Sequence, residues 1–476
     1  MKRTSALGYL TAAFLTLVAI SPVRAADAPM KDWPQWRGPT ATGAAAPDAK
    51  PPTEWSETKN VKWKVKLPGS GLSTPIVVGD RVFIQAAVEV ANAPAGPAAA
   101  AAEANPPVRL VQDQPPRRRP PGGPGGPGRG PGGPGGFGQQ QAPTKPLAFT
   151  LLCFDRNTGK TLWEKVAKQE IPAEGHHPDG SYASQSPVTD GKLVFVNFGS
   201  HGLYGYDLDG NLKWSKDLGK MQVKMSFGEG SSPALHGDTL VVNWDHEGPS
   251  FIAAFDKNTG HELWRTPRQE GTTWTTPLIV EHDGKAQVVV CATGTIRSYD
   301  LQSGKEIWHC GKLTDNVIPT PVADADTVYA TSGFKGAALL AIKLGKSGDL
   351  TGSDSIAWTA NKGTPYVPSP LLYNGRLYLF GGNNGQLSCY DVKTGKALLS
   401  QQRIDDIQGV YASPVAANGH VYMLSRTGAT VVMQDGEQPK ELRTNQLDDQ
   451  FHASPAIAGN EIFLRGFKSL YCIADK

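Results

Sequence analysis

Short apolar stretches separated by glycine, asparagine and aspartate turns run along most of the chain, and this pattern repeats. Each unit opens with a Ser-Pro or Thr-Pro step and continues with an apolar strand, a tight turn and a second strand. The prolines that open the units are Pro75, Pro187, Pro233, Pro277, Pro321, Pro370, Pro414 and Pro455. From Pro187 onward they stand 41 to 49 residues apart, the length of one four-stranded propeller blade. The pattern therefore predicts an all-β protein, an eight-bladed β-propeller.

The second half of most units holds a third strand, an acidic turn and a fourth strand with a tryptophan. Aspartate at such a turn accepts hydrogen bonds from the nearby backbone, and glycine supplies the positive φ that closes the hairpin. The tryptophan is a large apolar body that packs one blade on the next. We interpret the following residues as structural blade motifs: Asp155, Gly159, Trp163, Trp214, Asp256, Gly260, Trp264, Asp300, Gly304, Trp308, Trp358 and Trp63. The sixth and seventh units lack the tryptophan, so we expect those blades to be held less tightly.

The last unit reaches Lys476 after only three predicted strands. Residues 60–67 alternate between apolar and polar side chains around Trp63, which is the pattern of the missing fourth strand. Pairing of the first and last strands in one blade closes the ring and removes an exposed sheet edge. We therefore predict that the propeller spans residues 61–476.

Residues 1–25 have the pattern of a secretory signal peptide. Lys2 and Arg3 precede an uncharged apolar run from Ala6 to Ile20, and small residues around Ala25 form the expected cleavage site. The run is shorter than the roughly 20 apolar residues needed to cross a bilayer. We therefore expect an exported protein, periplasmic or extracellular, whose mature chain has no transmembrane segment and no lipid anchor.

Two segments depart from the propeller pattern. Residues 26–60 form an arm rich in tryptophan and proline, and we expect it to pack along the propeller rim because exposed indole rings are costly in water. Residues 86–147 form an insertion within the first blade that is rich in alanine, proline and glycine. This composition cannot bury a core, so the insertion is expected to be disordered.

Charge and cysteine usage exclude several classes of function. The chain has 47 Lys and Arg against 44 Asp and Glu, and removal of Lys2, Arg3 and Arg24 with the signal peptide leaves no net charge. Nucleic-acid binding requires a basic face, so no such partner is expected. The five cysteines are isolated in sequence, with no CxxC motif for zinc or haem and no vicinal pair. We expect buried free thiols.

One face of the predicted propeller carries more aromatic and polar side chains than the other. Aromatic residues stand just before the innermost strands, and polar residues occupy the loops between the second and third strands. The candidate ligand- or partner-binding residues are Tyr182, His201, Phe227, Asp245, His246, Trp274, Tyr366, Tyr411, Arg426, Phe451 and His452. Such a ring suits recognition of a small molecule or peptide, whereas the alternative is that the aromatics plug the channel and pack adjacent blades. Asp245 and His246 have no partner at metal-ligand spacing, so no metal site is predicted.

The acidic turn, the Ser-Pro spacing and the eightfold count resemble the PQQ-like β-propeller repeat family. That family includes quinoprotein alcohol dehydrogenases and the propeller lipoprotein of the outer-membrane β-barrel assembly machinery. Resemblance to its catalytic members implies a vicinal cysteine pair over the cofactor, a longer chain, and a calcium site built from Glu, Asn and Asp. This sequence has no such pair and is shorter.

Two functions follow from the resemblance. The first is a non-catalytic exported scaffold that binds a protein or peptide of the cell envelope without a cofactor. The alternative is a PQQ-dependent quinoprotein dehydrogenase that oxidises a small alcohol or sugar with PQQ and Ca²⁺. The departures from the catalytic pattern favour the scaffold. A sensory or carbohydrate-associated role of the same aromatic face is a third possibility.

Overall fold

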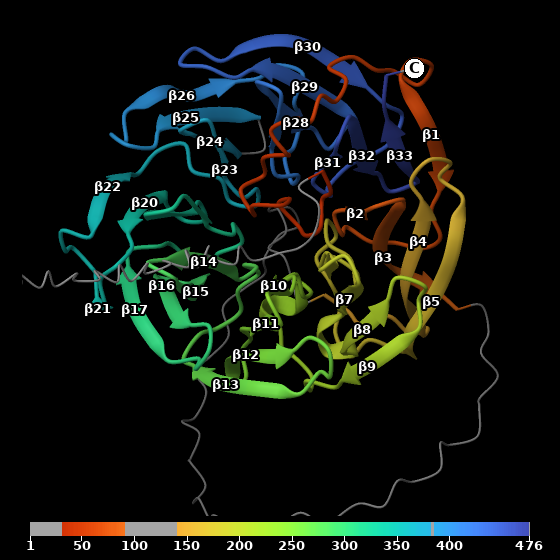
Figure 1. The fold of residues 1–476 in the computed structure, drawn as a ribbon, viewed down its shortest axis with the longest axis horizontal. Helices are drawn as coiled ribbons and strands as arrows, with labels where there is room; N and C mark the ends of the chain where they lie inside the picture. The colour runs from red at the N-terminus through yellow and green to blue at the C-terminus, as the bar shows by residue number, and fades with distance from the viewer. Residues whose placement is uncertain (1–30, 91–139, 382–384, 476) are drawn as a thin grey trace, which may run out of the picture.

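The computed structural model describes residues 31–90, 140–381 and 385–475 of the chain. Eight antiparallel sheets stand around a central axis, one for each predicted repeat, which confirms the eight-bladed propeller (Figure 1). Blade 1 consists of β2–β5, and the blades then follow in sequence order around the ring. The predicted signal peptide lies outside the described residues, and among the described residues no helix has the length and apolar character to cross a bilayer.

Strands at equivalent positions of the blades form four sets around the ring. The innermost strands are β2 (Ile76–Val78), β6 (Val188–Thr189), β10 (Ala234–His236), β14 (Leu278–His282), β18 (Val322–Ala323), β23 (Leu371–Tyr373), β27 (Val415–Ala417) and β31 (Ala456–Ala458). The second strands are β3 (Arg81–Glu89), β7 (Leu193–Asn197), β11 (Thr239–Trp244), β15 (Lys285–Ala292), β19 (Thr327–Ser332), β24 (Arg376–Gly381), β28 (His420–Leu424) and β32 (Glu461–Arg465). Both sets are largely buried.

The third strands are also largely buried, whereas the outermost strands meet solvent. The third strands are β4 (Leu147–Asp155), β8 (Leu203–Asp207), β12 (Ser250–Asp256), β16 (Thr295–Asp300), β20 (Ala338–Lys343), β25 (Gln386–Asp391), β29 (Ala429–Gln434) and β33 (Ser469–Ile473). The outermost strands are β5 (Thr161–Glu170), β9 (Leu212–Lys216), β13 (Glu262–Arg268), β17 (Glu306–Gly311), β22 (Ile356–Ala360), β26 (Ala397–Arg403), β30 (Lys440–Gln446) and β1 (Val61–Lys66). A short strand β21 (Gly348–Asp349) pairs in parallel with β17, and two 3₁₀ turns are η1 (Gly199–His201) and η2 (Lys224–Ser226).

The ring is closed by the two ends of the propeller. Strand β1 pairs antiparallel with β33, with Trp63 opposite Cys472, so blade 8 has the order β1-β33-β32-β31. The predicted closure is confirmed. All five cysteines are buried and unpaired, as the sequence indicated.

Hydroxyl groups of the Ser-Pro and Thr-Pro steps link neighbouring blades around the axis. The backbone N–H of Thr74 donates to Ser186 Oγ at 2.9 Å, and that of Ser186 donates to Ser232 Oγ at 2.9 Å. Equivalent bonds continue through Thr276, Thr320, Ser369, Ser413 and Ser454. The repeated hydroxyl therefore satisfies a buried donor of the preceding blade at each step.

The blade tryptophans pack on the turn of the next blade. The ring of Trp63 lies over Gly159, where a Cβ atom would come within 2.7 Å of it, and Trp63 Nε1 donates to Arg156 O at 2.8 Å. Trp163, Trp214, Trp264 and Trp358 make the same bond with the turn of the following blade. Trp308 instead donates to Gln287 within its own blade. In the turns, Asp155, Asp256 and Asp300 accept backbone N–H bonds, and Gly159, Gly260 and Gly304 have positive φ.

Contacts of a different kind hold blades 6 and 7, whose outermost strands lack the tryptophan. Arg376 of blade 6 forms an ion pair with Asp435 of blade 7 at 2.6 Å. Between blades 7 and 8, Trp55 of the arm stacks on Tyr422, and its backbone N–H donates to Asn445 Oδ1 at 2.8 Å. The arm thus contributes an indole ring where the repeat has none.

The structure corrects two expectations about the non-propeller segments. The arm does not follow the rim: it crosses the innermost strands, where Trp33 pairs with Val77 and Ala44 with Ala416 (Figure 1, red-orange chain at the centre). In this position Trp33 is fully buried. The ends of the 86–147 insertion belong to the sheet, because Ala86 to Glu89 pair with residues 147–150 in β4. Residues 91–139 of the insertion lie outside the described residues.

Candidate functional site

A cavity of about 830 Å³ occupies the channel at the face that carries the aromatic ring. This volume is in the range of small-molecule and peptide sites. Six of the residues expected at a binding face line it: Phe227, Trp274, Tyr366, Tyr411, Arg426 and His452. The lining residues that the sequence did not single out include Trp36, Asp179, Glu229 and Asn316.

The aromatic side chains are fixed around the cavity by contacts with one another and with the backbone. Trp274 Nε1 donates to Gly228 O at 2.7 Å. Tyr366 stacks on Phe334 with ring centroids 4.8 Å apart, and Tyr411 stacks on His452 at 4.2 Å. These flat surfaces come from different blades, so the ring fold assembles them from segments far apart in sequence. They offer a ligand a pre-formed apolar wall.

A loop of residues 171–184, between β5 and β6, reaches across the mouth of this cavity; we call it the strap. On one side the His177 N–H donates to Phe227 O at 3.0 Å. On the other side the Asp179 carboxylate accepts Tyr411 Oη–H at 2.7 Å and forms an ion pair with Arg426 at 2.8 Å. The strap therefore joins blade 3 to blade 7 over the mouth, and most of its links are side-chain contacts.

Charge at the strap is arranged to keep Asp179 ionised and His452 neutral. Burial alone raises the pKa of Asp179, but the Tyr411 hydrogen bond and the Arg426 charge outweigh it and hold the pKa below its ordinary value. His452 Nδ1 lies 3.0 Å from Asp179 O. Burial, with help from the Arg426 charge, lowers the pKa of His452 to about 4. Because a carbonyl only accepts, the neutral ring carries its proton on Nδ1.

The floor of the cavity is Trp36, which comes from the arm. The next residue, Arg37, is buried, and its Nη2 donates to Pro370 O and Pro414 O at 2.9 Å each. Those carbonyls belong to blades 6 and 7. Because Pro370 and Pro414 stand just before innermost strands, the arm crosses the channel at the inner end of the cavity.

Three of the expected binding residues lie away from the cavity. Tyr182 packs its ring edge against His176 within the strap, and its hydroxyl donates to Glu174 O. Phe451 is fully buried against Tyr471. His201 is buried, stacks on Phe149 and places Nδ1 2.5 Å from Glu170 Oε1. All three sit behind the cavity wall, where they hold the loops in place.

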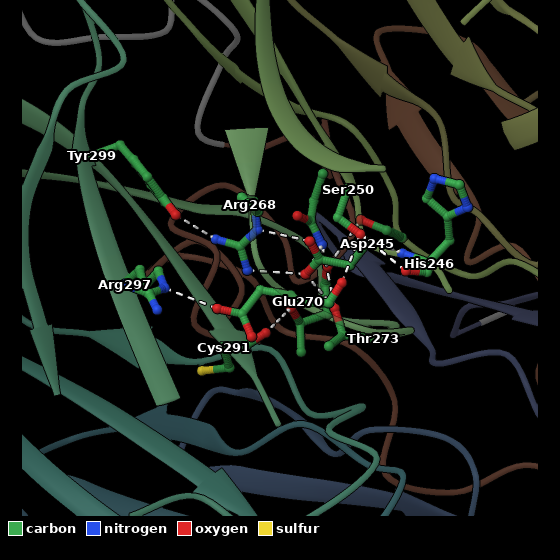
Figure 2. Close-up of polar contacts among 12 residues, drawn as sticks. Asp245, His246, Ser250, Arg268, Glu270, Thr273, Cys291, Arg297 and Tyr299 are labelled. Carbon is green, nitrogen blue, oxygen red and sulfur yellow. Dashed lines mark hydrogen bonds and ion pairs between the residues drawn. The ribbon is translucent and has the colours of Figure 1, made fainter. Parts of the chain in front are cut away.

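Asp245 and His246 belong to a buried polar network between blades 3 and 4 (Figure 2). Arg268 binds both carboxylate oxygens of Asp245, at 2.7 and 2.9 Å, and neither side chain is exposed. Thr273 also donates to Asp245, and both ring nitrogens of His246 contact backbone groups. Within the described ranges, no cluster of three or more His, Cys, Asp or Glu residues is arranged to hold a metal.

Glu229 is a carboxyl group at the edge of the cavity with an unusual environment. Its Oε2 accepts the N–H of Ser200 in η1 at 2.7 Å. Burial raises the pKa of Glu229 to about 7, because the hydrogen bond to Ser200 only partly compensates for lost hydration. No sequence motif marks this residue, since its environment depends on packing between blades 2 and 3.

A family model described as outer membrane protein assembly factor BamB matches residues 147–248 and 248–474, more than half of the chain. The chain belongs to this PQQ-like propeller family. None of the curated proteins compared with it matches.

Solved structures of two dehydrogenases show the same fold as this chain. Quinohemoprotein alcohol dehydrogenase from Comamonas testosteroni is 11% identical with a TM-score of 0.59, covering 94% of this chain and 81% of that one. A europium-containing methanol dehydrogenase is 10% identical with a TM-score of 0.55, covering 93% and 91%. BamB from Moraxella catarrhalis is 12% identical with a TM-score of 0.49, covering 68% and 93%.

The dehydrogenase members of this fold raise the question of whether the cavity fits a quinone cofactor. Pyrroloquinoline quinone is a flat tricarboxylate, so its site needs several cations. Among the described lining residues, the one Lys or Arg side chain is Arg426, which already pairs with Asp179. Asn316 Oδ1, a potential calcium ligand, accepts Lys224 Nζ at 2.8 Å. The lining does not fit this cofactor and its calcium ion.

Proposed function

We propose that this protein is a non-catalytic binding propeller of the cell envelope that takes a segment of a protein or peptide partner into its channel-mouth cavity. The family model supports this proposal through its description as an outer membrane protein assembly factor. The signal-peptide pattern of residues 1–25 supports an exported protein in the periplasm or outside the cell.

The observation that carries the proposal is the aromatic lining of the cavity in the channel. Aromatic side chains supply most of the energy at protein interfaces, because they bury a large area with few rotatable bonds. Phe227, Trp274 and Tyr366 present such surfaces on one side of the cavity. Their positions are set by the fold before any partner arrives, which reduces the entropy cost of binding.

A quinoprotein dehydrogenase is the competing function, and fold likeness alone speaks for it. Among the described lining residues, the one guanidinium is that of Arg426, which is already paired with the Asp179 carboxylate. A tricarboxylate ligand would find no unpaired Lys or Arg side chain in this lining. We therefore propose no bound PQQ, no Ca²⁺ and no alcohol oxidation.

The test is recovery of partners from envelope extracts with the purified mature protein and its variants. Trp274→Ala and Tyr366→Ala each remove a cavity wall, whereas the control Leu212→Ala removes an exposed apolar side chain on the outer strand β9. We expect both cavity variants to recover at least about tenfold less partner, consistent with aromatic residues at an interface centre, and the control to behave like the parent. Equal recovery by all four proteins would contradict the proposal.

A titration with PQQ and Ca²⁺ tests the competing function in the same preparation. Tryptophan fluorescence reports binding because Trp36 and Trp274 line the cavity, and dye-linked oxidation of alcohols reports turnover. We expect no saturable quenching and no turnover. Saturable binding with turnover would replace the scaffold proposal with a dehydrogenase.

A further inference from the structure

We propose that Trp36 limits how far a ligand enters the channel, so that the cavity takes a side chain or a tight turn of the partner rather than an extended chain threaded through the ring. This inference rests on the proposed function, because it assumes that the cavity receives a ligand. Beyond the proposed function, it names Trp36 as the residue that limits ligand size, and it states which shape of partner segment fits the cavity.

Trp36 differs from the other two tryptophans of the arm. Trp33 is fully buried and Trp55 is 3% exposed, and both pack into the hydrophobic core. Trp36 keeps part of its surface exposed and contributes that surface to the cavity. An entering group therefore meets the indole of Trp36 at the inner end.

The arm is tied to blades 1 and 2 on one side of Trp36. Trp33 exchanges two backbone hydrogen bonds with Val77, at 3.0 and 2.9 Å. The Thr189 N–H donates to Pro34 O at 2.9 Å. Backbone pairing of this kind resists displacement, since each opened bond leaves a buried polar group without a partner.

On the other side of Trp36 the arm is tied to blades 6 and 7. The Leu372 N–H donates to Thr42 O at 3.1 Å, and the Ala416 N–H donates to Gly43 O at 3.0 Å. These anchors and those on blades 1 and 2 come from well-separated parts of the ring (Figure 1). The segment that carries Trp36 is thus suspended across the channel and held at both ends.

The turn after Trp36 fixes the course of the backbone next to this residue. Arg37 has φ 81°, in the left-handed region, and its guanidinium donates to the carbonyls just before β23 and β27. Gly38 follows at φ 78°, where a Cβ atom would come within 2.8 Å of the Trp33 ring. A backbone held in this strained form persists only when the surrounding contacts determine it. Trp36 therefore acts as a fixed floor.

A chain threaded through the ring would have to displace these anchors, whereas a side chain or tight turn enters and leaves by the mouth. The cavity of about 830 Å³ has the volume for such a group. The ligand that fits is an apolar or aromatic projection of limited length, and the distance from the mouth to Trp36 sets that limit.

The experiment measures the affinity of 4-alkylphenols of increasing chain length by calorimetry. The proteins compared are the parent, Trp36→Phe, Trp36→Ala and the control Trp55→Ala, each checked for folding by thermal melting. Each added methylene that is buried strengthens binding about fourfold. In the parent we expect affinity to rise with chain length and then fall once the alkyl chain reaches Trp36.

In Trp36→Ala the fall should move to longer chains, with the longest phenols bound at least about tenfold more tightly than by the parent. Trp36→Phe should lie between the two, and Trp55→Ala should keep the parental limit because that ring stacks on Tyr422 outside the cavity. An unchanged limit in Trp36→Ala, or the same shift in Trp55→Ala, would overturn this inference and leave the proposed function standing. Failure of every protein to bind even the short phenols would overturn both.

Discussion

The two ends of the channel are closed by different kinds of contact. At the inner end the arm pairs its backbone with the innermost strands and buries Trp33 and Arg37 completely or nearly so. At the outer end the strap reaches blade 7 mainly through the Asp179 side chain, whose partner Arg426 is 40% exposed. Exposed ion pairs contribute little stability, whereas buried backbone pairing costs much to open. We therefore predict that the strap opens more readily than the arm.

The largest expected effect comes from removing the buried indole of the arm. Trp33→Ala should lower the free energy of unfolding by about 3–5 kcal/mol, because the side chain is fully buried and leaves a cavity. Chemical denaturation measures this loss. The matched variant Trp36→Ala should cost less, since that indole is partly exposed. Equal costs would show that the two rings are equally important to the arm.

Lowering the pH should reduce the stability of the folded protein through protonation of His452, which contacts the strap. Its pKa is about 4 in the folded protein against an ordinary 6.5, so the unfolded chain binds the proton first as pH falls. Stability from this residue is therefore complete above about pH 6.5 and declines toward pH 4, by about 2–3 kcal/mol in total. Denaturant titrations of the parent and His452→Phe measure it.

The comparison with His452→Phe isolates this contribution. Glu229 acts in the opposite direction, because its raised pKa of about 7 favours the folded state at low pH, but it is present in both proteins and cancels in their difference. The parent's advantage over His452→Phe should shrink between pH 6.5 and 4. A difference that is constant with pH would contradict the neutral, buried state of this ring.

A smaller effect is expected from the turn after Trp36. Gly38→Ala adds a Cβ atom at φ 78° against the Trp33 ring and should cost about 1–2 kcal/mol more than the control. The control is Gly79→Ala, also at positive φ but with open space around the position. An equal loss of stability in the two variants would mean that the arm shifts to accommodate the added Cβ atom.

The smallest change in stability should come from the strap itself. Asp179→Asn removes the charge that binds Arg426 and should cost at most about 1 kcal/mol, because the pair is partly exposed. Amide hydrogen exchange of residues 172–184 should nevertheless become faster, while exchange of residues 33–45 stays unchanged. The exposed Asp405→Asn is the control. Faster exchange at the arm as well would show that the two ends open together.

The repeats could be predicted from the sequence because their signals are local and periodic. The Ser-Pro steps, the acidic turns and the tryptophans recur at one spacing, and together they specify blades, closure and the packing of Trp63 on Gly159. The same repeat spacing placed aromatic residues just before the innermost strands. Trp274 and Tyr366, which were expected at the binding face on this basis, line the cavity.

The parts that break the repeat could not be predicted in the same way. Asp179 meets Tyr411 across 232 positions of sequence, and Arg37 meets Pro414 across 377. Such contacts depend on where the closed ring brings single residues, and no period marks them. Trp55 stands between blades 7 and 8 for the same reason. Asp245, expected at the binding face, lies in the buried network between blades 3 and 4, where it pairs with Arg268 of β13.

Site-specific photo-crosslinking in envelope extracts tests most directly whether the strap end of the channel receives the partner. A benzophenone amino acid replaces Tyr366 in the cavity wall or Tyr373 at the turn between β23 and β24, on the arm side. The account predicts a partner adduct from position 366 that Trp274→Ala reduces, and none from position 373. Adducts from position 373 alone would contradict it and place the binding surface at the other end of the channel.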